Sequence, residues 1–248
     1  MKILLLNPNT TEAVTDLLAA AAAPGLSPGT ELVKSTAPRG VPYIANRAEA
    51  LIGGAIALET LAAVQHEYDA AIIAAFADPG LGAARELFPL PIVGLAEAGM
   101  LAASMLGRSF SIVTFTDALQ PWYRECVEWT GMAARCASIR TLGEPFQAIG
   151  NVQHEKEEKL VALAQAAVRE DGADVIITAG APLAGLAARI RNRIDVPVVE
   201  CVVAAVRMAE MLVTMNPRKP TAGTYRRPPG KPSIGLDPAL AAWIAGDS

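Results

Sequence analysis

Aromatic residues are scarce in this sequence and make up 5% of its 248 positions. The hydrophobic residues, 52% of the chain, are therefore mainly aliphatic, a composition that favours α/β architecture over an all-β sandwich. High apolar content and a net charge of only -4 exclude a disordered or fibrous chain. The length fits one large domain or two lobes and is sufficient to bury a substantial core.

Histidine and cysteine are also rare. The two histidines, His66 and His154, lie far apart, so a histidine-based zinc site is not expected. The three cysteines, Cys126, Cys136 and Cys201, form no CxxC pair, and we expect free thiols in a reducing compartment. No glycine-rich nucleotide-binding motif follows a predicted strand. The sequence therefore predicts a protein without a metal or a cofactor.

Excess positive charge is missing too. The 21 Lys and Arg residues are outnumbered by 25 Asp and Glu residues, so we expect no nucleic-acid partner. One local basic cluster is interpreted as a solvated surface segment, with contact to a partner subunit or an anionic ligand as the alternative. It comprises Arg218, Lys219, Arg226, Arg227 and Lys231.

Long apolar runs are absent as well. No segment reaches the run of about 18 apolar residues that a helix needs to span a bilayer. The apolar stretch at Met1–Leu6 is too short for the core of a signal peptide and meets Asn7 at once. We therefore expect a cytoplasmic protein without a membrane partner.

Short apolar runs alternate along the chain with longer Ala- and Leu-rich segments. The nearly continuous apolar run 69–76 is typical of a parallel strand that is covered on both faces. A tail rich in Pro and Gly begins at Asn216, with a short helix possible near Leu240. The pattern predicts strands at 2–6, 31–35, 69–76, 91–95, 109–115, 174–178 and 197–200, and helices at 12–23, 47–67, 81–87, 118–130, 155–170, 184–193 and 201–215.

The two halves of the chain repeat one another. Residues 69–75 match residues 174–180, and each copy is followed by a small-residue loop, a Leu-Ala-Arg helix and a strand that starts with proline. Two copies with a long period indicate two similar lobes rather than a solenoid. We predict an α/β fold of two pseudo-symmetric lobes, each a small parallel sheet flanked by helices. The predicted division is 1–97 plus 205–248 for the N-terminal lobe and 98–204 for the C-terminal lobe.

Four loops follow predicted strands and are expected to meet at a cleft between the lobes, because ligands of parallel sheets bind outside the carboxyl ends of strands. The helix start after Asn7-Pro8-Asn9-Thr10 suits a carboxylate or imide oxygen, although an ordinary capped turn fits equally well. The small residues Ala179-Gly180-Ala181, in the loop after the predicted strand 174–178, let backbone N–H groups approach a ligand. The predicted ligand-binding residues are Asn7, Asn9, Thr10, Ala75, Phe76, Thr114, Thr116, Ala179, Gly180 and Ala181.

Four segments in this order resemble the hydantoin/allantoin racemase branch of the aspartate/glutamate racemase superfamily. The resemblance covers nearly the whole chain and implies a site in the cleft between two lobes. It also implies cofactor-independent chemistry at the carbon α to a carbonyl, in small carboxylates or cyclic imides such as hydantoins, by an isomerase-like homo-oligomer. The segments are Asn7-Pro8-Asn9-Thr10, 75–81 (Ala-Phe-Ala-Asp-Pro-Gly-Leu), Ser111-Ile112-Val113-Thr114 and 180–186 (Gly-Ala-Pro-Leu-Ala-Gly-Leu).

The family mechanism uses two cysteines, one on each face of the reacting carbon, because a thiol can both remove and return a proton. The matching positions in this chain are Ala75 and Gly180, and neither residue can carry a proton. The other candidate proton carriers are Asp78, Tyr43 and Glu200. Each also has an ordinary structural interpretation: Asp78 as a turn residue, Tyr43 as a residue packed on the rim of the cleft, and Glu200 as the cap of the following helix.

Three functions follow from this pattern. The chain could act at the α-carbon with proton carriers other than the two thiols, including as a racemase with a different pair of bases. A decarboxylase or lyase on the same scaffold needs one acid on a single face, since only one proton transfer at carbon occurs. A non-catalytic small-molecule-binding protein is the third reading.

Overall fold

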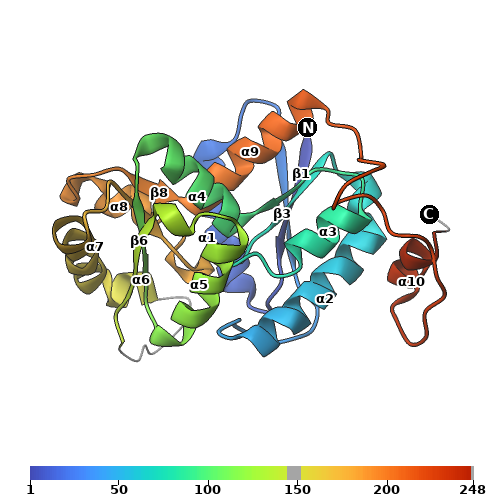
Figure 1. The fold of residues 1–248 in the computed structure, drawn as a ribbon, viewed down its shortest axis with the longest axis horizontal. Helices are drawn as coiled ribbons and strands as arrows, with labels where there is room; N and C mark the ends of the chain where they lie inside the picture. The colour runs from blue at the N-terminus through green and yellow to red at the C-terminus, as the bar shows by residue number, and fades with distance from the viewer. Residues whose placement is uncertain (144–151, 247–248) are drawn as a thin grey trace.

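The computed structural model describes residues 1–143 and 152–246, which form two parallel four-stranded sheets flanked by helices (Figure 1). The strand orders are β2-β1-β3-β4 and β6-β5-β7-β8, which confirms the predicted α/β fold. The first sheet contains β1 (Lys2–Asn7), β2 (Glu31–Thr36), β3 (Ala70–Ile73) and β4 (Ile92–Gly94). The second contains β5 (Phe110–Thr114), β6 (Cys136–Thr141), β7 (Val175–Thr178) and β8 (Val198–Glu200).

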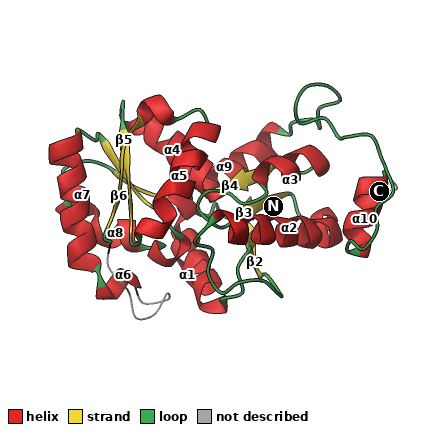
Figure 2. Ribbon diagram, turned by 60° about the horizontal axis from the view of Figure 1, so that its bottom comes forward, coloured by secondary structure: helices red, strands yellow, loops and turns green. Residues whose placement is uncertain are grey.

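Helices cover the faces of both sheets (Figure 2). The central strands β3 and β7 are buried along their whole length, as expected for strands with helices on both sides. The α-helices are α1 (Glu12–Ala22), α2 (Arg47–Val64), α3 (Leu81–Leu87), α4 (Leu95–Leu106), α5 (Gln120–Trp129), α6 (Val152–Glu155), α7 (Glu157–Asp171), α8 (Leu186–Ile190), α9 (Cys201–Met215) and α10 (Pro238–Ala245).

The repeat seen in the sequence is a structural repeat. Strands β3 and β7 hold equivalent third places in their sheets, each between a central strand and an edge strand. Both pair in parallel with the first strand of their lobe, β1 or β5. Their carboxyl ends carry the two segments that include Ala75 and Gly180, which is why one site can draw on both lobes.

Two elements were not predicted. Helix α4 follows β4 directly, as α9 follows β8, and its Ala- and Leu-rich segment was left unassigned. Strand β6 lies at the edge of the second sheet and has Ile139 as its one large aliphatic residue, whereas the edge strand β2 carries the adjacent pair Leu32-Val33.

Helices α4 and α9 pack against each other where the two sheets meet (Figure 1). One buried apolar cluster runs through both lobes and includes Ile72 of β3, Ile177 of β7 and Val206 of α9. The predicted lobe boundaries at 97/98 and 204/205 fall inside these two helices. That division stays a prediction. The shared cluster joins the two lobes, and a second apolar cluster lies within the first lobe.

One helical segment, Arg47–Glu67, is long and apolar enough by composition to cross a membrane. It comprises α2 and the turn after it, and 44% of its most apolar window is buried inside the fold. Buried residues such as Ile56 and Leu61 pack in the core of the first lobe, and α10 lies against the same helix. The segment therefore has the packing of a core helix.

Candidate active site

Loops from both lobes enclose one small cavity. Its volume is about 20 Å³, enough for about one water molecule. Six predicted site residues line it: Asn9, Tyr43, Ala75, Phe76, Gly180 and Ala181. The sequence analysis missed the other four, Ile44, Trp122, Tyr123 and Pro182. The expected meeting of the β1, β3 and β7 loops is therefore present in the fold.

The loop after β1 positions Asn9 through its neighbours. Asn7 is fully buried, and its side-chain nitrogen donates to the Asn9 Oδ1 at 3.0 Å and to the Thr15 Oγ1 at 2.9 Å. The same Asn9 oxygen accepts from the Thr11 amide at 3.0 Å. Because the Asn9 Oδ1 already accepts hydrogen bonds inside the loop, the side-chain nitrogen of Asn9 is the group that can donate to a ligand. Asn7 supports the site without lining it.

The turn after β3 is strained where it leaves the cavity. Ala77 and Asp78 have positive φ angles of 75° and 53°, which non-glycine residues rarely adopt. The Asp78 carboxylate holds this turn by accepting hydrogen bonds from the Ala96 and Glu97 amides at 2.7 and 2.8 Å. Asp78 therefore caps the first turn of α4 and points away from the cavity that Ala75 and Phe76 line.

Burial raises the pKa of Asp78 to about 7, against the opposing effect of the two amide hydrogen bonds. Glu97 raises the pKa further, while Arg85 lowers it. Arg85 also pairs with Glu97, so the carboxyl belongs to a buried network at the junction of α3 and α4. In this network Asp78 has a structural role, because its carboxyl group holds the turn after β3 in place.

Gly180 adopts a conformation that suits glycine alone, with φ at 105°. A Cβ at this position would lie 3.0 Å from a Phe115 ring carbon, 3.4 Å from the Tyr123 hydroxyl oxygen and 3.7 Å from the Thr114 Oγ1. The direction in which a side chain would project is therefore filled by an aromatic ring and two hydroxyl groups. The next residue, Ala181, opens a short 3-10 turn, so its N–H has no partner within that turn.

Tyr43 and Tyr123 are the titratable side chains that line the cavity. Burial raises the pKa of Tyr43 well above its usual value, and the Glu49 charge adds to that rise. Burial also raises the pKa of Tyr123, with Tyr43 and Cys201 as further causes and Thr114 acting in the opposite direction. Both phenols are thus neutral near pH 7 and can donate protons, whereas neither is a base at that pH.

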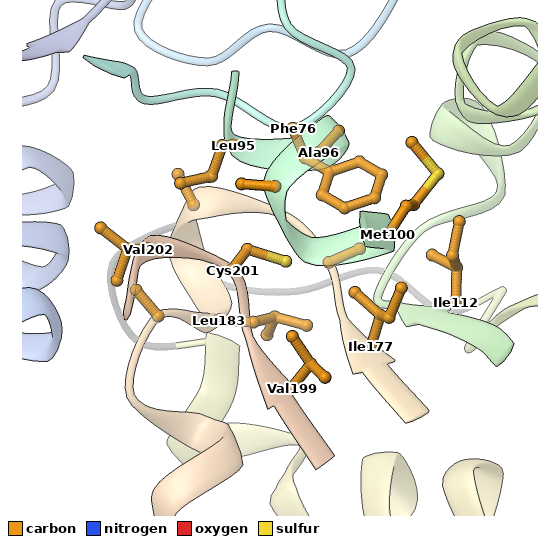
Figure 3. Close-up of a cluster of buried hydrophobic side chains, with 14 of the residues drawn as sticks. Phe76, Leu95, Ala96, Met100, Ile112, Ile177, Leu183, Val199, Cys201 and Val202 are labelled. Atoms are coloured by element: carbon orange, nitrogen blue, oxygen red, sulfur yellow. The ribbon is translucent and has the colours of Figure 1, made fainter. Parts of the chain in front are cut away.

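No cysteine lines the cavity. Cys201 lies among apolar side chains of both lobes, including Phe76, Met100 and Ile177 (Figure 3), and its thiol donates to the Thr178 carbonyl at 3.6 Å. Burial raises the pKa of Cys201 and Cys126 well above the usual value, so both are protonated core residues. The half-buried Cys136 has a pKa raised to about 11, mainly by burial. All three thiols are free.

Glu200 lies elsewhere, at a surface groove of about 1080 Å³. One carboxylate oxygen accepts from the Gly185 amide at 2.7 Å. Burial raises the pKa of Glu200 to about 7, partly offset by amides of Gly185, Ala187 and Val202. The groove is lined mainly by apolar residues of α1, α4 and α9. Glu200 therefore caps helix starts outside the small cavity.

The remaining predicted residues surround the cavity without lining it. The buried Thr114 lies near the Cβ direction of Gly180, and Thr116, two residues farther along the chain, is half-buried. The Thr10 amide bonds the Val41 carbonyl, and the Ala179 amide bonds the Val113 carbonyl. These contacts hold the loops that carry Asn9, Tyr43 and Gly180. Within residues 1–143 and 152–246, no three His, Cys, Asp or Glu side chains gather to hold a metal ion.

The missed residues Trp122 and Tyr123 come from α5, a helix that the sequence analysis predicted without assigning it to the site. Their aromatic character in an aromatic-poor chain was the available signal. Helical spacing alone does not say which side of α5 faces the first lobe.

Comparisons with known proteins agree with this geometry. The family model described as Asp/Glu/hydantoin racemase matches residues 3–209. A hydantoin racemase of Paenarthrobacter aurescens is 34% identical over 233 residues, covering 93% of this chain and 99% of that protein. The allantoin racemase of Klebsiella pneumoniae has a TM-score of 0.91 at 33% identity, covering 97% of this chain and 98% of the other. The allantoin racemase of Pseudomonas fluorescens has a TM-score of 0.88 at 34% identity, covering 95% and 100%.

Proposed function

Because the chain belongs to the Asp/Glu/hydantoin racemase family, we propose that its interlobe cavity takes a small carboxylate or cyclic imide and acts at the carbon next to its carbonyl. In this proposal Tyr123 is the proton donor at that carbon, with Tyr43 beside it. The observation that carries the proposal is the position of the Tyr123 hydroxyl oxygen, 3.4 Å from where a Cβ on Gly180 would lie. A phenol thus lies where a side chain from the second family position would reach.

The raised pKa values keep both tyrosines as neutral phenols near pH 7, so neither can serve as the base. A neutral phenol can protonate an enolate, but it cannot remove a proton from carbon near pH 7. Racemisation needs both events, whereas decarboxylation needs only the donation. In decarboxylation the bond from the α-carbon to the carboxylate breaks, CO2 leaves and its electron pair forms the enolate. Tyr123 then gives its proton to the carbon and recovers one from water.

Ligand binding in this proposal uses hydrogen-bond donors that the loops present. The Asn9 amide nitrogen and the Ala181 N–H come from opposite lobes, so a ligand oxygen between them would bridge the lobes. Such donors stabilise the negative charge that develops on an enolate oxygen. The proposal needs no metal or cofactor.

The test is to incubate the protein with 2-phenylmalonate or 5-phenylhydantoin in D2O and follow both by NMR. We expect CO2 release from the malonate, with one deuterium on the product α-carbon, and no exchange of the hydantoin α-proton. Tyr123→Phe should lower the rate by about 10²–10⁴-fold, the usual contribution of a general acid. Tyr68→Phe is the matched control, because Tyr68 packs beside Lys2 outside the cavity.

Two results would contradict the proposal. Exchange of the hydantoin α-proton would show that a base acts in the cavity, which favours racemisation by another pair of groups. Ligand-induced thermal stabilisation without turnover of either compound would favour the non-catalytic binding protein.

A further inference from the structure

One exposed ion pair joins the two lobes. The Arg47 Nε lies 2.9 Å from each carboxylate oxygen of Glu125, and the Arg47 Nη2 also donates to this carboxylate. Arg47 opens α2 in the first lobe, and Glu125 lies on α5 in the second. Of the ion pairs within residues 1–143 and 152–246, this is the only one whose partners lie on different sides of the predicted lobe division.

The partners of this pair lie next to the segments that carry the two phenols of the cavity. Tyr43 precedes Arg47 by four residues, and Tyr123 precedes Glu125 by two. Inside the site, the Tyr43 ring packs against the Phe115 ring of the second lobe, with centroids 5.8 Å apart. The segment from Tyr43 to Arg47 therefore contacts the second lobe through a ring in the interior and through a charge at the surface.

Arg47 is held firmly by its own lobe. The Asn46 Oδ1 accepts from the Glu49 amide at 3.0 Å, and the Glu49 carboxylate accepts from the Ala45 amide at 2.6 Å. Such a reciprocal cap fixes the direction in which the chain enters a helix. Because the start of α2 is fixed in this way, a contact at Arg47 restrains α2 and the Tyr43 segment together.

Helix α5 has two different faces. Trp122 and Tyr123 are buried and line the interlobe cavity, whereas the Glu125 side chain is 51% exposed. Glu125 and Arg47 border an open cavity of about 320 Å³ at the surface. A contact between such exposed charges is weakened by dissolved salt, whereas the contact between uncharged rings is not.

We propose that the Arg47–Glu125 ion pair is a clasp that holds the Tyr43 segment and α5 together across the interlobe cavity. Loss of either charge, or screening by salt, loosens the two walls of the cavity. The inference goes beyond the proposed function, because it concerns how the site is held together and does not depend on the reaction that occurs there.

Hydrogen exchange of the ligand-free protein, followed by mass spectrometry, tests the clasp, since exchange rates report local opening. Arg47→Gln should speed exchange in peptides from 41–46 and 120–129 by about two- to fivefold, the effect of losing one exposed ion pair. Raising KCl to 1 M should speed the same peptides in the unaltered protein and change Arg47→Gln little. Arg47→Glu combined with Glu125→Arg should recover most of the protection.

Arg39→Gln is the matched control. Arg39 is as exposed as Arg47, at 60%, but its partner Glu59 belongs to the same lobe, so exchange in 120–129 should stay unchanged. Unchanged exchange in 120–129 for Arg47→Gln overturns the proposal, as does an equal increase for Arg39→Gln. Failure of the charge-swapped protein to recover protection also overturns it. Because no ligand is present, a protein that turns over neither 2-phenylmalonate nor 5-phenylhydantoin still gives a decisive result.

Discussion

The Gly180 backbone packs closely against the Phe115 ring, which limits the side chains that residue 180 can carry. The φ of 105° at Gly180 directs a Cβ to within 3.0 Å of the Phe115 ring. A cysteine at this position would meet both backbone strain and the ring. The space that a side chain at residue 180 would take is therefore filled by local packing.

Gly180→Ala should lower the free energy of unfolding by about 1–3 kcal/mol, the range for a side chain forced into a disfavoured backbone region. Urea denaturation measures it. Gly131→Ala is the control, because Gly131 has a φ of 73° and nothing within 4 Å of its Cβ direction, so only the backbone cost of about 1–2 kcal/mol applies. An equal loss in both variants would show that the Phe115 contact costs nothing.

The sequence located the residues of the site better than their roles. Asn9, Ala75 and Gly180 could be placed together because the ends of parallel strands share one edge of a sheet. Asp78 was a candidate because it is an acid that follows a strand end. The direction of its side chain depends on the positive φ angles of Ala77 and Asp78 and on the start of α4, and the sequence pattern indicated neither. Chain reversals of this kind are set by tertiary packing.

At the scale of elements, every predicted strand contains two adjacent aliphatic residues and the missed strand β6 does not. Strands β3 and β7 are fully buried and the edge strand β2 carries Leu32-Val33, whereas β6 has Ile139 alone. Helix α4 was left unassigned, although it follows β4 directly as the predicted helix α9 follows β8. The helix that Asp78 caps was thus the one the sequence analysis lacked.

Asp78 couples the stability of the β3–α4 junction to pH. Its pKa of about 7 in the fold exceeds the ordinary value of 3.8, so the folded state holds the proton more tightly. Between about pH 4 and pH 7 the unfolded chain ionises first, and stability that is present at low pH is lost as pH rises. Asp78→Asn cannot titrate. Relative to the unaltered protein, the variant should gain unfolding free energy across this window, as measured by urea titration at several pH values.

Asp78→Ala separates the cap from the charge. It removes both hydrogen bonds to the Ala96 and Glu97 amides and should cost about 1–3 kcal/mol at pH 5. Glu12→Gln, at an exposed carboxyl on α1, should leave the pH profile unaltered. A profile for Asp78→Asn parallel to that of the unaltered protein would refute the coupling.

The C-terminal helix α10 fastens the tail to the first lobe. Trp243 packs edge-on against Phe88 at 5.2 Å, donates its indole N–H to the Ala62 carbonyl at 3.2 Å and lies under the Arg227 guanidinium. Trp243→Ala should therefore lower the unfolding free energy by about 3–5 kcal/mol. Ligand binding at the distant cavity should be unchanged. A calorimetric melt and the titration with phenylhydantoin check the two parts, and a stable variant with impaired binding would contradict the assignment.

The candidate site lies where two similar lobes meet, and the apolar groove of about 1080 Å³ that holds Glu200 lies away from that site. Helices α4 and α9 form one side of the groove and also pack the lobes together. A partner that covers the groove would therefore contact the same two helices that join the lobes.

We expect a second copy of the chain to cover this groove. Its rim exposes Met105, Leu106 and Met211 by 78%, 57% and 51%, while Arg207 is already paired with Glu210. A face on which exposed apolar side chains lie beside an apolar groove suits an identical partner in a two-fold arrangement. Sedimentation velocity should give a dimer or larger assembly, and Met105→Glu with Met211→Glu should yield monomer. Leu51→Glu, equally exposed at 78% on α2, should leave the assembly intact. A monomer at all concentrations would exclude this interface.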